Sequence, residues 1–208
     1  MSPRAAFVFF CLLLTPQVVQ ANGTEHALSF VNTCMGEPEL EAIEDALVQQ
    51  SWQATAPSDD LINGLAWIGM NLYFIGDSGG ERYDTIYDLK LKSAKGTLRK
   101  KDIPQSMNRY FTRATDTGDE ILHVVWQLPV PHVTEIHCRA ALLPASLADV
   151  RRQIGAQDLP AFAALDTVKT EDGTFNITLL NNEKFEALTP PDAIVTTYRQ
   201  VRTEKVTP

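Results

Sequence analysis

The stretch ILHVVWQLPVPHVTEIHCRAAL, residues 121–142, decides the fold of this chain. Apolar and polar residues alternate in its first and last segments, which is the pattern of strands with one buried face. Pro129 and Pro131 interrupt the alternation and predict a turn between two strands, over 121–128 and 134–142. The residues expected to face the core are Leu122, Val124, Trp126 and Leu128 in the first strand, and Ile136, Cys138, Ala140 and Leu142 in the second.

The segments on either side add strands to the same sheet. A turn at 116–119, with the sequence Asp-Thr-Gly-Asp, joins a strand over 109–115 to the strand over 121–128. The dipeptide Asp172-Gly173 is typical of a hairpin turn. Further strands are predicted over 168–170, 175–180 and 193–201, and from Tyr83 to Lys92, where Tyr87, Leu89 and Leu91 alternate with Asp88, Lys90 and Lys92.

Helices are expected at two main places. Apolar residues recur at helical spacing over 38–50, behind an acidic first turn, and again over 144–155. Residues 58–75 predict a helix followed by a short strand, because two glycines interrupt the helical pattern and aromatic residues gather at its end. The order of elements predicts an α+β fold with an antiparallel sheet. The length is typical of a single domain over 22–208.

The N-terminus is typical of a secretory signal peptide over 1–21. Arg4 is followed by an apolar run over 5–14, and Val19-Gln20-Ala21 is a small-residue cleavage pattern. We therefore expect a mature chain that begins at Asn22 and lies in the periplasm or outside the cell. No later stretch has the roughly 20 mostly apolar residues that a membrane-spanning helix needs.

Cleavage after Ala21 would remove Cys11 and leave two cysteines, Cys34 and Cys138. Two cysteines in an exported chain most simply form one disulfide. This bond would tie the start of the helix over 38–50 to a central strand. Closing a loop of about 100 residues stabilises a fold by about 4–5 kcal/mol in the chain-entropy model.

The net charge of −8 argues against a general nucleic-acid-binding protein, because phosphate backbones are bound by Lys and Arg. The charge is uneven, however. Six basic residues lie within twelve positions: Lys90, Lys92, Lys95, Arg99, Lys100 and Lys101. This cluster is able to meet an anionic surface, although lysines also occur on solvated strand edges, where they discourage pairing.

The segment Gly76-Asp77-Ser78-Gly79-Gly80 resembles the nucleophile loop of trypsin-like serine proteases and the first block of GDSL-type esterases. Either resemblance implies that Ser78 is a nucleophile, which needs a neighbouring base. The trypsin-like order needs an upstream histidine, and the esterase order needs one near the C-terminus. Only His26 lies upstream, and no histidine follows His137. A glycine-rich turn is therefore expected, and a serine hydrolase using Ser78 stays the enzymatic alternative.

His123 and His137 fall on the outer face of adjacent predicted strands, with Glu135 and Arg139 nearby. Two imidazoles and a carboxylate are suitable ligands for a transition metal. Arg139 opposes a cation there, so we expect solvent-facing histidines, with a metal-binding domain as a second alternative. The sequence contains no complete catalytic, cofactor or metal signature, and no cofactor is expected.

The chain resembles small exported proteins of proteobacteria that have no assigned activity. The shared features are the signal peptide, Phe30-Val31 three residues before Cys34, an acidic helix that ends near Trp52, and a strand carrying Cys138 ahead of a helix. The resemblance implies export and one disulfide, and it implies no activity. The leading hypothesis is a non-catalytic domain that binds a protein or an envelope component.

Overall fold

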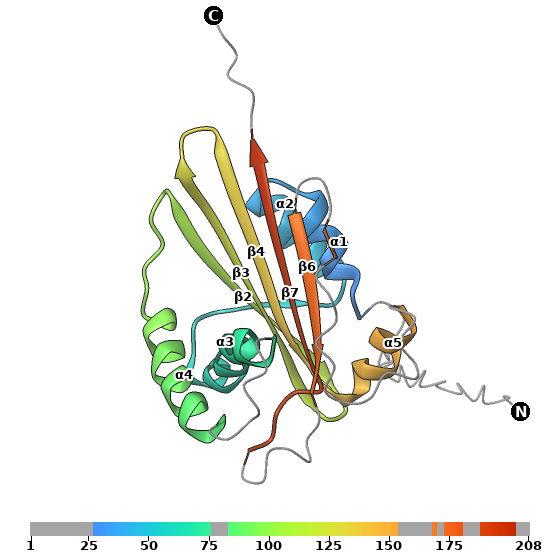
Figure 1. Cartoon of the computed structure of the whole chain (residues 1–208). Coiled ribbons are helices and arrows are strands. Elements are labelled where there is room, and N and C mark those ends of the chain that lie inside the picture. The colour runs from blue at the N-terminus through green and yellow to red at the C-terminus, as the bar shows by residue number, and fades with distance from the viewer. Residues whose placement is uncertain (1–26, 76–82, 154–167, 170–172, 181–187, 203–208) are drawn as a thin grey trace, which may run out of the picture.

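The computed structural model describes residues 27–75, 83–153, 168–169, 173–180 and 188–202. A single antiparallel sheet runs through them, with the strand order β1-β2-β3-β4-β7-β6-β5. Helices lie on both of its faces, so the molecule has three layers (Figure 1). The predicted α+β class, the antiparallel sheet and the disulfide are confirmed.

The centre of the sheet follows the alternation of the sequence. The strands β2 (Ser106–Thr115), β3 (Gly118–Val130) and β4 (Val133–Leu142) form consecutive hairpins, with Leu122 opposite Ala140. The last strand, β7 (Ala193–Arg202), pairs with β4. The other strands are short or lie at the sides: β1 (Gln53–Thr55), β5 (Val168–Lys169) and β6 (Gly173–Leu179).

One face of the sheet packs against the helices α1 (Ser29–Gly36) and α2 (Leu40–Gln49). The inward residues predicted for β3 and β4 are buried there, apart from Leu128, which is half-buried. Cys34 lies inside α1 and is bonded to Cys138 on β4, 104 positions away. The disulfide therefore joins α1 to the sheet, rather than the start of the helix over 38–50, because Cys34 belongs to a separate helix that precedes α2.

The opposite face is covered over part of its length by α3 (Ile62–Ile75), which follows the short 3-10 helix η1 (Asp59–Leu61), and by α4 (Tyr83–Leu98). The short strand predicted at the end of 58–75 is wrong, because α3 continues to Ile75. Both glycines of α3 allow close packing. A Cβ on Gly64 would lie 2.2 Å from Ile121 Cδ1, and one on Gly69 would lie 3.2 Å from Lys90 Cδ.

The strand predicted from Tyr83 to Lys92 is also wrong, because this segment belongs to α4. Tyr83, Tyr87 and Ala94 are buried at helical spacing, whereas Leu89 is 58% exposed. A short alternation of apolar and charged residues was outweighed by helical periodicity over the whole helix. The basic cluster therefore lies on α4 and just after it, not on a strand edge.

The last helix, α5 (Pro144–Gln153), agrees with the helix predicted from residue 144. It lies at one end of the sheet (Figure 1). Asp149 is 3% exposed, and its Oδ2 accepts a hydrogen bond of 2.7 Å from the backbone N–H of Ala27. This contact ties α5 to the start of the described chain.

Candidate functional site: a cationic pocket on the sheet

A pocket of about 610 Å³ lies between the α3–α4 pair and the face of the sheet that these helices cover. Its walls come from both helices and from β2, β3, β4, β6 and β7. Five basic side chains line it: Lys90, Lys100, His123, His137 and Arg139. No aspartate or glutamate is among the described residues that line it. We call this feature the cationic pocket.

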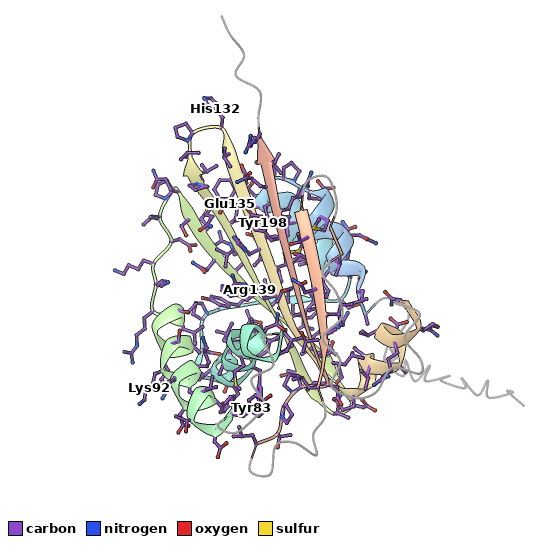
Figure 2. All side chains as sticks on the ribbon, in the orientation of Figure 1. Tyr83, Lys92, His132, Glu135, Arg139 and Tyr198 are labelled. Carbon is purple, nitrogen blue, oxygen red and sulfur yellow. A yellow bond between two sulfur atoms is a disulfide. The ribbon has the colours of Figure 1, made fainter. Side chains whose placement is uncertain are left out.

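Arg139 is the central charge of the cationic pocket. It lies on β4 opposite His123 on β3 and Thr196 on β7, and it is half-buried. Figure 2 shows it close to the helices that cover the sheet. Burial lowers the pKa of its guanidinium. Within the described part of the chain, no ion pair or hydrogen bond of this guanidinium is present. A desolvated cation without a counter-charge is costly, which favours an anion beside it.

His123 is buried rather than solvent-facing, with 4% of its surface exposed. The prediction that it faces solvent is wrong, because α3 and α4 cover this part of the sheet. Its ring stacks on Tyr110 at 4.8 Å, and its Nε2 lies 3.0 Å from Asn108 Oδ1. Burial lowers its pKa to about 3, with further contributions from the positive charges of Arg139, His137 and Lys100. The imidazole is therefore neutral at ordinary pH.

His137 is opposite Val125, two positions from His123, so the structure brings both histidines into one pocket. Burial is the main cause that lowers the pKa of His137, Arg139 adds to it, and Glu135 opposes it. The described residues contain no group of three His, Cys, Asp or Glu side chains placed to hold a metal ion. The positive charge of Arg139 beside the two rings disfavours a cation in any case.

Glu135 organises the rim of the cationic pocket. Its Oε2 accepts from Gln127 Nε2 at 2.8 Å, and its Oε1 accepts from the Tyr198 hydroxyl at 3.1 Å and from Gln200 Nε2 at 3.2 Å. The hydrogen bond from Gln127 is the main cause that lowers the pKa of Glu135, so this carboxylate is ionised and held in place. Glu135, Tyr198 and Arg139 lie on the same face of the sheet (Figure 2).

Two further features were predicted from the sequence, the basic cluster and the glycine-rich segment around Ser78. Lys90, which is half-buried, and Lys100, which is exposed, line the cationic pocket, whereas the other members of the basic cluster are exposed and do not line it: Lys92, Lys95, Arg99 and Lys101. Ser78 and the rest of its glycine-rich segment lie outside the described residues. The sequence predicts for Arg139 only that it opposes the binding of a metal ion. The signal that could have identified it is its place on the polar side of the β4 alternation, beside two histidines.

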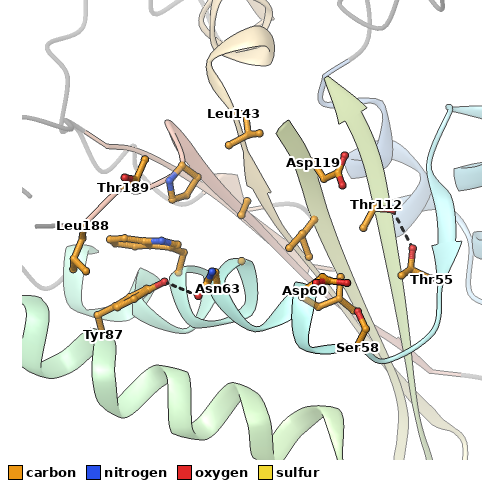
Figure 3. Close-up of a pocket in the computed structure, with 16 residues that line it drawn as sticks. Thr55, Ser58, Asp60, Asn63, Tyr87, Thr112, Asp119, Leu143, Leu188 and Thr189 are labelled. Atoms are coloured by element: carbon orange, nitrogen blue, oxygen red, sulfur yellow. Dashed lines mark hydrogen bonds between the residues drawn. The ribbon is translucent and has the colours of Figure 1, made fainter. Parts of the chain in front are cut away.

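A second pocket, of about 620 Å³, lies at the other side of α3 (Figure 3). Trp67 and Tyr87 line it with ring centroids 4.5 Å apart, and Tyr87 donates to Asn63 Oδ1 at 3.4 Å. Asp60 and Asp119 are the charged residues in its lining, and both are exposed. Exposed charges are stabilised by water, so this pocket lacks the desolvated, unpaired charge that marks the cationic pocket.

Comparison with protein-family models, curated proteins and solved structures gives no match for this chain. Among the described residues, no helix is both long enough and apolar enough to cross a membrane. The functional argument therefore depends on the pockets themselves.

Proposed function

We propose that this protein is an exported, non-catalytic binding protein, and that the cationic pocket holds a small organic anion. The observation that carries the proposal is the half-buried guanidinium of Arg139, which has no acidic partner in the described part of the chain. Lys90 and Lys100 add positive charge to this pocket, and none of the described residues that line it carries a carboxylate. This concentration of positive charge is a local feature of the pocket, since the chain as a whole carries a net charge of −8.

Binding rather than catalysis is proposed because, among the described residues that line the pocket, no serine is hydrogen-bonded to a histidine. A nucleophilic serine needs a base within hydrogen-bond reach. The ring of His123 is engaged instead with Asn108 Oδ1, at 3.0 Å, and with the ring of Tyr110. Guanidinium and ammonium groups bind carboxylates and phosphates through charge-assisted hydrogen bonds, which are about twice as strong as neutral ones.

Calorimetric titration with inorganic phosphate and with citrate tests the binding site. We expect Arg139→Gln to weaken binding of both anions at least about tenfold. Arg99→Gln is the matched control, since Arg99 is exposed and does not line the pocket but carries the same charge. If wild-type protein binds neither anion, or if the two variants bind equally well, the proposal is wrong.

Export is tested separately from the site. The signal peptide predicted over 1–21 and the disulfide support it, because disulfides form and persist in oxidising compartments. N-terminal sequencing of protein from native cells is expected to begin at Asn22. A chain recovered with Met1 intact would contradict the proposed location and would leave the binding site as it stands.

A further inference from the structure

We propose that the anion held in the cationic pocket is hydroxylated, which makes it a sugar acid, a sugar phosphate or a related polyol anion. This inference rests on the binding function proposed above and specifies its ligand. The evidence is that the lining of the pocket combines cationic hydrogen-bond donors with acceptors that Glu135 orients.

The donor side consists of Arg139 and Lys100. Guanidinium and ammonium groups have several N–H donors and no acceptor. A ligand needs at least one carboxylate or phosphate group to match them. This side alone would accept a simple inorganic anion as well as an organic one.

The acceptor side is formed by Gln127 and Tyr198, which Glu135 orients. The Tyr198 hydroxyl donates its hydrogen bond to Glu135 Oε1, so its oxygen can only accept a hydrogen bond from a ligand. Gln127 Nε2 lies 2.8 Å from Glu135 Oε2 and 3.5 Å from His137 Nε2. The amide nitrogen is thus occupied, and Gln127 Oε1 is the acceptor that remains. Hydroxyl groups of a ligand supply the donors that these two oxygens need.

The walls between the two sides are mostly polar. Hydroxyl groups line the pocket on helix α4 at Ser93 and Thr97, and on the strands at Ser106, Thr174 and Thr196. Pockets for apolar ligands are lined mainly by hydrophobic and aromatic side chains, with only a few polar groups. Thr97 Oγ1 already donates to the Ser93 carbonyl oxygen at 3.2 Å. An anion with a hydrocarbon body would offer the other hydroxyl groups no partner, and unpaired polar groups weaken binding. A polyhydroxylated body pairs with them.

Matched probes separate the two parts of the ligand. Gluconate and hexanoate are both six-carbon monocarboxylates, and only gluconate has hydroxyl groups along its chain. Glucose 6-phosphate and inorganic phosphate form a second pair, which distinguishes a phosphate from a carboxylate as the anionic group. Glucose supplies hydroxyl groups without charge. By calorimetry we expect at least one hydroxylated anion to bind about tenfold or more tightly than both its matched anion and glucose.

Two glutamine variants test the acceptor side. Gln127 and Gln200 both donate to Glu135, but only Gln127 lines the pocket. We expect Gln127→Met to weaken binding of the hydroxylated anion at least about tenfold more than binding of the matched simple anion, which removes most of the preference. Gln200→Met is the control and keeps the preference. Equal loss of the preference in both variants would overturn the role given to Gln127.

The outcomes distinguish this inference from the function on which it rests. If gluconate binds no better than hexanoate and glucose 6-phosphate no better than phosphate, while Arg139→Gln weakens all four, the ligand is not hydroxylated but the anion site stands. If neutral glucose binds as tightly as the anions, or if no probe binds, the anion site itself is wrong.

Discussion

At the scale of single residues, charge is buried in two different ways. Glu120 is fully buried, and its Oε2 accepts from Arg113 Nε at 2.9 Å and Nη2 at 2.7 Å, while its Oε1 accepts from the Leu143 N–H at 3.0 Å. The Arg113 guanidinium also lies 4.3 Å from the Trp52 ring centroid. This pair is saturated and serves the fold. Arg139 is half-buried without such partners and lines the cationic pocket, and these two observations together support the binding role proposed for it.

Removing one member of the saturated pair is expected to be costly. Arg113→Met leaves the Glu120 carboxylate buried and unpaired, and breaking a buried pair in this way costs about 3–5 kcal/mol. The double variant Arg113→Met, Glu120→Leu is expected to be more stable than the single variant, because no unpaired charge is left. Urea unfolding of the three proteins measures the difference. A double variant that is less stable than Arg113→Met would contradict the argument.

His123 makes stability depend on pH. Its pKa is about 3 in the folded protein and 6.5 for the free side chain, so between these values the unfolded chain binds a proton that the folded chain does not. Stability is therefore full above pH 6.5 and falls as the pH drops toward 3, by about 1.4 kcal/mol per pH unit from this group. We expect His123→Gln to flatten this dependence.

Denaturant unfolding across pH 7 to 4 measures the effect. The control is His132→Gln, since His132 is exposed in the turn after β3 and lies outside the pocket. Parallel pH curves for wild type and His123→Gln would show that the burial of His123 has no such consequence.

At the scale of elements, α3 lies close to the sheet because it has no side chain at position 64. Gly64→Ala would place a Cβ 2.2 Å from Ile121 Cδ1, and we expect the overpacking to cost about 1–3 kcal/mol even though alanine favours helices. Gly96 in α4 has open space around it, so Gly96→Ala is expected to stabilise the protein by up to about 1 kcal/mol. Thermal unfolding of both variants checks the opposite signs. Two shifts in the same direction would refute the packing argument.

The same helices show why part of the fold could not be read from local patterns. Residues 83–92 alternate over too short a distance to distinguish a strand from a helix with a charged outer side. The end of 58–75 is rich in residues that favour strands, yet it continues as α3. Strand preference is a preference for a half-buried pleated surface, so the packing of the earlier part of α3, up to Met70, against the sheet and α4 outweighs it.

At the scale of the whole molecule, one covalent bond joins the helical layer of α1 and α2 to the sheet. We expect the double variant Cys34→Ala, Cys138→Ala to be about 2–5 kcal/mol less stable than the wild type, because the bond restricts a long loop in the unfolded chain. Thermal unfolding with and without reductant provides the measurement. If wild type unfolds at the same temperature under both conditions, and the variant does too, the bond has no stabilising role.

The sequence by itself determined the central hairpins, the residues on their buried face and the disulfide. The hairpins and their buried face depend on a period of two along each strand. The disulfide depends on the small number of cysteines that cleavage of the predicted signal peptide would leave. Neither requires knowledge of distant contacts. It also placed His123, His137 and Arg139 on one side of the sheet. Only the tertiary structure decided that α3 and α4 cover that side, which buries His123 and encloses Arg139. The close packing of α3 on the sheet depends on the contact between Gly64 and Ile121, which are 57 positions apart in the sequence. A local sequence pattern cannot predict such a long-range contact.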